Sequence, residues 1–330
     1  MAAYWISRCL IKDAVQYKKY TDLVPAIIAA HGGRVLARGG RYQIMEGPET
    51  FQRFVVIEFP TLEAGRDCFL SPEYRAAAGH RRGGAGVVEN VIVEGGEATM
   101  SHVFTPRPVV SVPVLGRSET FPVHRIYCVG RNYEEHAKEM GFTGREPPFF
   151  FLKPADAALV VPAGETGTLP YPSLTKNLHH EIELVVAIGS GGKNISAANA
   201  HTHIFGYAVG LDMTRRDLQG EAKKQGRPWC TGKGFDHSAP IGPITPVAQA
   251  GDIVNAAISL QVNGQPRQGS HIHKLIWNIA ETVEHLSAAW ELMPGDLIYT
   301  GTPEGVNAVV AGDLMVGSVS GLGELRVKVL

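Results

Sequence analysis

The sequence predicts a two-domain α+β protein, and three observations lead to that fold class. Residues 4–95 alternate strand-like and helical segments. A stretch rich in glycine, proline, serine and threonine follows, from about residue 95 to 120. From residue 121 onward short strand-like runs dominate and only a few helices interrupt them. We interpret the middle stretch as a domain boundary, because such a composition is typical of linkers.

The first domain, residues 1–97, begins with apolar alternation over Tyr4–Ile11, which predicts a strand. Helical spacing then extends from Asp13 to Ala30 and stops before Gly32. The remaining predicted elements are strands at 34–37, 42–45 and 54–59, a helix that Thr61 caps, and a strand at 87–93. Apart from one additional strand-like run between the helices, this is the order βαββαβ, which is typical of a ferredoxin-like fold.

Residues 98–120 are predicted to be a linker that ends in an entry strand, and residues 121–330 to form the second domain. The strand-like runs of this domain are 125–129, 182–188, 256–262, 296–300 and 324–329, and the main predicted helix is Lys274–Leu292.

The first domain resembles a small family of uncharacterised ferredoxin-like domains. The resemblance rests on Tyr4-Trp5, on the run 37–41 and on the run 71–74. It implies a dimerisation or small-ligand module of unknown function. A catalytic role for His80, Arg38 or Arg41 is the alternative, and no cluster of nucleophiles or metal ligands accompanies them in the sequence.

Composition and the absence of targeting signals favour a cytoplasmic protein. The 330 residues are 44% hydrophobic and 19% charged, with a net charge of −1. This is typical of a packed globule and gives no electrostatic reason to expect nucleic acid or a membrane surface as partner. The four cysteines lack CxxC spacing, which is typical of reduced thiols. Neither a signal peptide nor a membrane-spanning run is visible.

Two carboxylates, Glu181 and Glu183, lie inside the apolar run Leu178–Ile188. Strand side chains alternate between faces, so both carboxylates point to the same side. Like charges in a segment suited to burial repel each other and lose hydration. A divalent cation offsets both costs, so the run predicts a metal site. The alternative is an edge strand with two solvated glutamates.

Asp212 is the predicted third ligand, because it follows the apolar run 208–211 at the end of a strand. Three carboxylates without a thiol favour Mg²⁺ or Mn²⁺ over Zn²⁺. His179 shares the face of the two glutamates and is a further candidate ligand, whereas His180 points away.

A second candidate centre is the segment Asn132–Gly141, predicted to be a short helix that Asn132 caps. His136 and Glu139 are three residues apart and share one face of it. A carboxylate beside an imidazole raises its basicity, which suits proton removal from water. A solvated surface pair is the alternative.

Three further residues are candidates for anion binding. Thr302 stands in a turn with glycines and a proline, where its hydroxyl and nearby N–H groups can meet an anion. Lys153 and Lys233 lie in apolar or glycine-rich surroundings and could stabilise an oxyanion or a carboxylate. An ordinary turn and ordinary surface lysines are the alternatives.

Together these motifs resemble the fumarylacetoacetate hydrolase superfamily from about Phe121 to the C-terminus. The motifs are Cys128–Tyr133 with His136, Phe151–Pro154, His179–Glu183, Gly210–Thr214 with Arg216 and Gln219, Lys233–Phe235 and Thr300–Pro303. Within the superfamily the chain is most similar to fumarylpyruvate hydrolases, through the runs 121–123, 145–150 and 236–243.

The resemblance implies a mixed β-sandwich roll in the second domain, with Mg²⁺ or Mn²⁺ on Glu181, Glu183 and Asp212. It implies that His136 and Glu139 activate water and that Lys233 assists at the metal-bound oxygen. The implied contacts to a dicarboxylic oxo-acid substrate are Arg131, Tyr133, Lys153, Arg216, Gln219 and Thr302. A homodimer is the expected assembly.

The implied reaction is hydrolysis of a carbon–carbon bond in a 1,3-diketo acid, most closely fumarylpyruvate to fumarate and pyruvate, as in the gentisate route of aromatic degradation. The alternatives are acylpyruvate hydrolysis, oxaloacetate decarboxylation and isomerisation of a 2-hydroxyhepta-2,4-diene-1,7-dioate. A non-catalytic oxo-acid sensor is a further alternative, against which the water-activating pair His136 and Glu139 argues.

Overall fold

The computed structural model describes residues 2–95, 103–135 and 145–330. The chain divides into two compact units, Met1–Pro106 and Arg107–Leu330, and each is described by itself.

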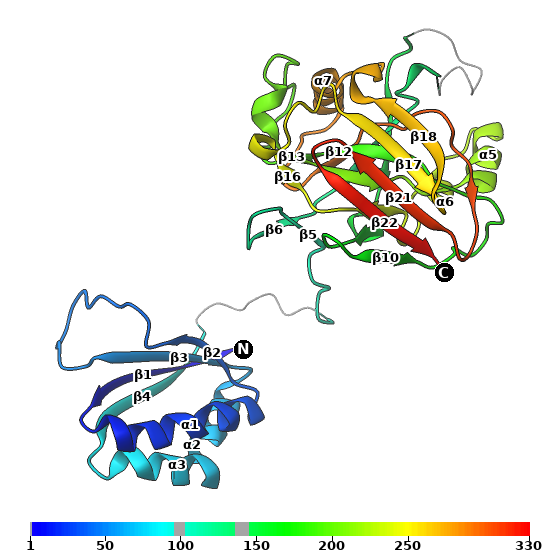
Figure 1. Cartoon of the computed structure of the whole chain (residues 1–330). Coiled ribbons are helices and arrows are strands. Elements are labelled where there is room, and N and C mark those ends of the chain that lie inside the picture. The colour runs from blue at the N-terminus through cyan, green and yellow to red at the C-terminus, as the bar shows by residue number, and fades with distance from the viewer. Residues whose placement is uncertain (1, 96–102, 136–144) are drawn as a thin grey trace. The chain divides into compact units, whose positions relative to one another are not determined.

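The first unit is a four-stranded antiparallel sheet with three helices on one face (Figure 1). The sheet has the order β2-β3-β1-β4, which is the predicted ferredoxin-like arrangement. The elements are β1 (Ala3–Ile11), α1 (Ala14–Ala30), β2 (Arg34–Arg38), β3 (Arg53–Phe59), α2 (Leu62–Leu70), α3 (Pro72–Arg82) and β4 (Gly86–Glu94). Its core joins Trp5 and Phe59 of the sheet to Ile28 and Tyr74 of the helices.

Two details of this unit differ from the sequence prediction. The run 42–45 forms no strand, and it lies in the loop between β2 and β3. The helix that Thr61 caps is divided into α2 and α3, because Ser71 adopts an extended conformation before Pro72. Proline disfavours a helical residue before it, and the Ser71 hydroxyl accepts a hydrogen bond from the backbone N–H of Tyr74 to cap α3.

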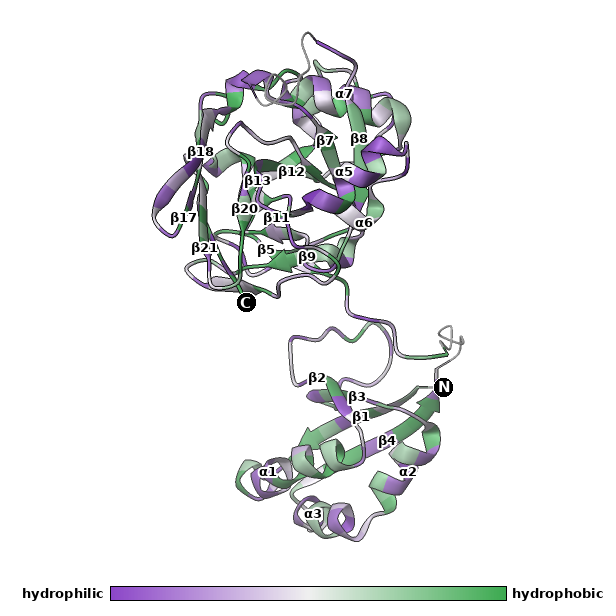
Figure 2. Ribbon diagram, turned by 90° about the vertical axis from the view of Figure 1, so that its right-hand side faces the viewer, coloured by the Kyte–Doolittle hydropathy of each residue, from purple (hydrophilic) through white to green (hydrophobic). Residues whose placement is uncertain are grey.

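A mixed eight-stranded sheet forms the centre of the second unit, in the order β8-β7-β19-β12-β13-β15-β9 with β16 beside β13. Its strands are β7 (Ile126–Gly130), β8 (Phe149–Lys153), β9 (Ala158–Val160), β12 (Ile182–Ile188), β13 (Ile204–Leu211), β15 (Ala239–Ile241), β16 (Thr245–Pro246) and β19 (Leu297–Tyr299). Figure 2 shows apolar residues concentrated on its central strands, whereas α5 (Arg216–Lys224) is largely hydrophilic.

A five-stranded sheet packs against this central sheet, which gives the curled two-layer arrangement expected for the second domain. Its strands, in sheet order, are β10 (Thr166–Leu169), β22 (Gly323–Val329), β21 (Leu314–Val319), β17 (Ala257–Val262) and β18 (Gln265–His271). The core between the two sheets includes Ile182 and Leu211 on one side and Leu260 and Leu325 on the other.

Smaller elements complete the second unit. They are β14 (Thr214–Arg215), β11 (Leu178–His179) and β20 (Ala308–Val309) in one small sheet, β5 (Ser111–Pro113) paired with β6 (Thr120–Pro122), α6 (Cys230–Lys233) and α7 (Ile279–Ala289). Among the described residues, no helix combines the length and apolarity needed to cross a bilayer.

The helix predicted at Lys274–Leu292 is shorter than expected. It begins at Ile279, because Asn278 and Glu281 form a capping box there. The preceding Trp277 is held in a non-helical conformation by Asn132, whose side chain bonds both its N–H and its carbonyl.

Candidate metal and substrate site

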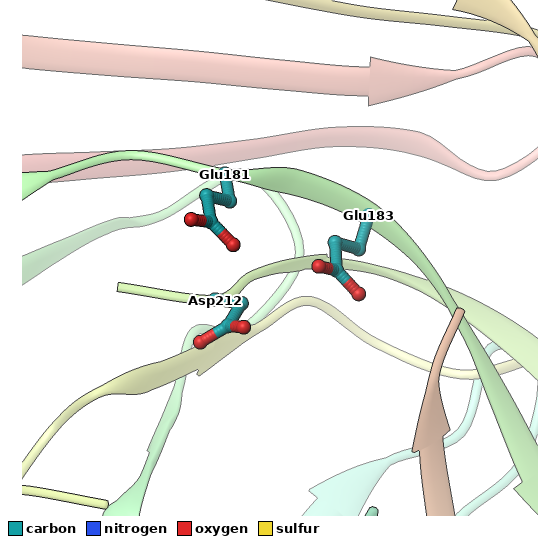
Figure 3. Close-up of side chains that lie close together, drawn as sticks. All are labelled: Glu181, Glu183 and Asp212. Carbon is teal, nitrogen blue, oxygen red and sulfur yellow. The ribbon is translucent and has the colours of Figure 1, made fainter. Parts of the chain in front are cut away.

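Three buried carboxylates converge where β12 begins and β13 ends (Figure 3). Glu181 precedes β12, Glu183 is its second residue, and Asp212 directly follows β13. The two strands are antiparallel neighbours, with Glu183 opposite Gly210, so the start of one meets the end of the other. One carboxylate oxygen from each residue lies within 4.8 Å of the others.

The burial of β12 excludes the alternative that Glu181 and Glu183 lie solvated on an edge strand. β12 lies between β19 and β13, and every one of its residues is buried. Glu183 is 2% exposed and Asp212 is 1% exposed. Carboxylates this deep need compensation by positive charge or hydrogen bonds.

Three cationic side chains supply part of this compensation. The Lys233 ammonium bonds Glu181 Oε2 at 2.8 Å and Asp212 Oδ2 at 2.6 Å. The Lys153 ammonium lies 2.8 Å from Asp212 Oδ1, outside hydrogen-bond alignment, so this buried oxygen has no hydrogen-bond donor among the described groups. Arg216 donates to Glu181 Oε1.

Glu183 has a different partner, because it accepts a hydrogen bond from the backbone N–H of Gly301 at 2.8 Å. Burial and the neighbouring carboxylates of Asp212 and Glu181 raise its pKa well above the ordinary value. Burial alone would lower the pKa of Lys233, but Asp212 and Glu181 outweigh that effect and raise it. The cluster therefore favours additional positive charge.

This donor set fits a hard divalent cation. Among the described residues, three carboxylates gather without a thiol or an imidazole in the group. Asp212 Oδ1 is close to the Lys153 ammonium but accepts no aligned hydrogen bond there, so it can also accept a cation. Oxygen ligands of this kind favour Mg²⁺ or Mn²⁺. His179 is outside the group, because its ring nitrogens face Asn177 and Arg216, and burial followed by Arg216 lowers its pKa to about 4.

The carboxylates open onto a cavity that several of the predicted substrate contacts also line. Arg131, Arg216, Gln219, Lys233 and Thr302 all stand in its wall. Its apolar side is aromatic and consists of Phe149, Phe151 and Trp229. The site therefore combines a negatively charged base, cationic groups and an aromatic wall.

The polar residues of the wall are held in place by one another. Arg216 begins α5 and donates to Gln219 Oε1 at 2.6 Å. The Thr302 hydroxyl donates to the carbonyl of Ile182 and accepts from Gln268 at 2.8 Å.

Arg131 combines an aromatic contact with an ion pair. It lies 5.1 Å from the centroid of the Phe149 ring, and its Nη2 atom is 3.3 Å from Glu146. The guanidinium is thereby directed along the aromatic wall of the cavity.

Two predicted substrate contacts lie outside the lining of this cavity. Lys153 is 1% exposed and donates to the backbone carbonyls of Met213, at 3.2 Å, and Lys233. It therefore stands behind Asp212. Tyr133 is buried, with a hydroxyl that has no partner among the described groups, and burial followed by Glu183 raises its pKa.

His136 and Glu139 lie outside the described residues. Asn132, predicted to cap their helix, uses its amide to join two other segments. It donates to the carbonyls of Thr300 and Trp277 and accepts from the Trp277 N–H. These bonds tie the start of the predicted catalytic segment to the strand end beside Glu183.

Sequence reasoning predicted that N–H groups of the turn around Thr302 can meet an anion, and the Gly301 N–H of that turn bonds the Glu183 carboxylate. It missed the Gln268 amide and the aromatic wall. The side-chain pattern of Phe149–Phe151 predicts a strand and nothing more. Gln268 lies in β18, where no local signal distinguishes it from a surface glutamine. Their roles follow from contacts between segments far apart in the chain.

Comparison with known proteins identifies relatives for both units. Residues 125–330 match the family model described as "Fumarylacetoacetate (FAA) hydrolase C-terminal". Residues 2–96 match the model described as "Domain of unknown function (DUF1330)".

Three relatives illustrate the match to the second unit. Fumarylpyruvate hydrolase from a Ralstonia species is 49% identical over 185 residues, 56% of this chain and 93% of that protein. Mitochondrial oxaloacetate tautomerase from Arabidopsis thaliana is 39% identical over 205 residues, 62% of this chain and 90% of that protein. A crystal structure is known for fumarylpyruvate hydrolase from Pseudomonas aeruginosa in complex with Mn²⁺ and pyruvate, and its sequence is 59% identical to this chain. The match covers 70% of this chain and 99% of that chain, with a TM-score of 0.69.

Proposed function

We propose that this chain, which belongs to the fumarylacetoacetate hydrolase family, hydrolyses fumarylpyruvate to fumarate and pyruvate. The family makes it a metal-dependent enzyme that acts on carbon–carbon bonds. The observation that carries the specific proposal is the convergence of Glu181, Glu183 and Asp212 at the base of a cavity that Arg131 and Arg216 also line.

In this proposal Glu181, Glu183 and Asp212 hold the divalent cation. When bound, the cation supplies positive charge for the 2-oxo-carboxylate end of the substrate and for the negative charge that develops during cleavage. The oxygen Asp212 Oδ1, which has no hydrogen-bond donor among the described groups, supports this role. Lys153 then positions Asp212, since its ammonium contacts that carboxylate from a buried location.

The substrate carries two carboxylates, and Arg131 and Arg216 are matched to them by charge. Gln219 positions Arg216 through their 2.6 Å hydrogen bond. Thr302 presents its hydroxyl in the cavity wall, and the Lys233 ammonium stands beside the reacting centre. Tyr133 remains a proposed substrate contact, with a buried hydroxyl that has no hydrogen-bond partner among the described groups.

Water activation is assigned to His136, with Glu139 orienting the imidazole. The imidazole takes a proton from water as the oxygen attacks the distal carbonyl carbon. The carbon–carbon bond then breaks, its electron pair goes to the pyruvate fragment, and a proton is delivered to that carbon. The new carboxyl group of fumarate then releases one proton to solvent, so fumarylpyruvate dianion and water give fumarate, pyruvate and one proton, and atoms and charge balance.

The direct test follows the ultraviolet absorbance of fumarylpyruvate with Mg²⁺ or Mn²⁺, beside acetylpyruvate and oxaloacetate. We expect the highest kcat/KM for fumarylpyruvate. Faster turnover of oxaloacetate would instead support the activity named for the Arabidopsis relative. A purely non-catalytic sensor would turn over none of the three.

Two substitutions assign the roles within this assay. His136→Ala should lower kcat by about two to four orders of magnitude with metal affinity unchanged, since a positioned general base is worth that much. Glu181→Ala should lose metal and activity together. Glu324→Ala is the matched control, because this exposed glutamate pairs only with Arg326 among the described residues. Near-normal kcat in His136→Ala with impaired metal binding would make His136 a ligand.

The proposal extends to the cell and the assembly. We propose a cytoplasmic homodimer that uses Mg²⁺ in the degradation of aromatic compounds through gentisate. Sedimentation equilibrium of the purified chain measures the assembly, and a monomer at micromolar concentration would contradict that part.

A further inference from the structure

The first unit contains a cavity that the proposed hydrolase reaction does not use. It lies between α1 and the face of the sheet that the helices cover. Much of its wall is aromatic or apolar, including Trp5 of β1, Ile57 of β3, Tyr20 and Val24 of α1, and Tyr74 of α3. Such a wall suits a flat, apolar ligand body.

Two arginines, Arg38 and Arg53, also line this cavity. Arg53 alternates with Val55 and Ile57 on the helix-facing side of β3, as strand geometry requires. Arg38 reaches the same side through an irregularity in β2.

The irregularity is a β-bulge between Val35 and Ala37. Val35 stands opposite Ile57, and Arg38 stands opposite Val55, so one extra residue is inserted in β2. Regular alternation from Val35 would turn Arg38 to the other face of the sheet. The bulge redirects this side chain into the cavity, which is a common use of bulges near binding sites.

No acidic residue lines the cavity among the described residues. The side chain of Arg53 has no hydrogen bond or ion pair within the described part of the chain, and Arg38 donates to the Thr21 carbonyl at 3.2 Å. The two arginines are diagonal neighbours on one sheet face, where like charges repel each other.

A third guanidinium, that of Arg81, is not in the cavity lining, but it contacts two residues that are, Tyr20 and Tyr74. Arg81 is 5% exposed, stacks 5.1 Å from the centroid of the Tyr20 ring and donates to the Tyr74 hydroxyl at 3.2 Å. Its Nε atom has no partner among the described groups, and no carboxylate pairs with it there. A buried cation without an anion is costly, so an anionic ligand would offset the cost.

We propose that this cavity binds a small aromatic carboxylate. Its ring lies against the apolar wall that Tyr20 and Val24 of α1 help to form, and its carboxylate pairs with Arg38 and Arg53. The inference concerns the first unit alone and does not depend on the function proposed for the second.

The test uses the full chain and the indole N–H of Trp5. Trp5 lines the cavity, and its indole N–H donates to Asn90 Oδ1 at 2.9 Å. Its NMR signal is assigned by comparison with Trp5→Phe. Benzoate should shift this signal in a saturable way. Benzamide has the same shape without charge, and acetate has the charge without a ring, so both should bind at least about tenfold more weakly.

Substitutions locate the carboxylate. Arg53→Gln and Arg38→Gln should each weaken benzoate binding about tenfold, the value of a charge-assisted hydrogen bond, while Arg53→Lys should keep part of the affinity. Arg34→Gln is the matched control, because Arg34 pairs with Glu58 and its side chain is 74% exposed.

Three results would overturn the proposal. They are a Trp5 signal that millimolar benzoate leaves in place, equal affinities for benzoate and benzamide, and unchanged benzoate affinity in Arg53→Gln. The second comparison uses the unaltered protein, so it decides the question even where a variant folds poorly.

Discussion

At the scale of single residues, Glu183 differs from the other two carboxylates in what neutralises it. Glu181 and Asp212 contact the ammonium of Lys233, whereas Glu183 accepts the Gly301 N–H. Burial and the two neighbouring carboxylates raise its pKa. Without a cation the folded state therefore favours the protonated form of Glu183, and a bound cation favours the carboxylate.

This difference predicts a pH dependence of stability. Because the pKa of Glu183 is higher in the folded than in the unfolded state, its contribution to stability is present below the unfolded pKa and is lost as the pH rises through the folded pKa. We expect the contribution of Glu183 to the unfolding free energy of metal-free protein to fall as the pH rises above 4.5, the ordinary pKa of this group. Glu183→Gln should lack that component.

Urea unfolding in the presence of a chelator, over a pH series, measures the unfolding free energy of the wild type and of Glu183→Gln. Glu324→Gln, at an exposed ion pair, is the control and should follow the wild type. Parallel profiles for the wild type and Glu183→Gln would contradict the assigned shift. With Mn²⁺ added, affinity should rise with pH, since the ligand must be deprotonated.

Lys233 gives a second prediction at this scale. Its buried ammonium bridges Glu181 and Asp212, so Lys233→Met leaves like charges facing each other. Removing one partner of a buried ion pair costs about 3–5 kcal/mol, and metal-free Lys233→Met should lose stability of that order. Mn²⁺ should restore much of it, because the cation replaces the missing charge.

Thermal unfolding of Lys233→Met and the wild type, with and without Mn²⁺, checks whether the cation restores the lost stability. The metal-induced rise in Tm should be larger for Lys233→Met than for the wild type, while kcat falls. Equal rises in the two proteins would show that Lys233 and the cation do not compensate the same carboxylates.

At the scale of elements, the turn after β19 links a strand end to the carboxylates. Gly301 has φ +103°, and a Cβ there would lie 2.6 Å from the Cβ of Asn132. Only glycine combines this backbone conformation with the close approach that brings its N–H to Glu183.

Gly301→Ala should therefore both destabilise the protein and weaken metal binding. Gly312→Ala is the control, since Gly312 has φ +97° but no atom within 4 Å of its Cβ position. We expect a loss of about 1 kcal/mol for Gly312→Ala from backbone strain. Gly301→Ala should lose about 1–3 kcal/mol more from the clash. Urea unfolding and Mn²⁺ titration measure the two effects, and equal losses would contradict the contact.

At the scale of the whole molecule, all residues assigned to the hydrolase reaction lie beyond Phe121. The second unit has cores of its own, formed by residues of that unit. A protein beginning at residue 101 should therefore fold, bind metal and turn over fumarylpyruvate with a similar kcat. A folded, metal-loaded but inactive protein would show that the first unit contributes to the reaction.

The sequence by itself determined what depends on local geometry. Alternation along a strand predicted that Glu181 and Glu183 share a face, and the apolar run before Asp212 predicted a strand end. The order of strands and helices predicted the ferredoxin-like first unit, and the family motifs predicted the curled sheets of the second, both of which are confirmed. These features need only the period of a strand or helix and the signals at its ends.

Tertiary structure alone decided which distant groups meet. The sequence proposed Asp212 as a partner of the glutamates, and the antiparallel register of β12 and β13 is what brings it to them. Lys153 stands behind Asp212, and the bulge in β2 turns Arg38 into the first unit's cavity. Such contacts depend on strand pairing across long sequence separations and on the balance of buried charge. No local pattern encodes either of these, so they appear only when the whole chain is folded.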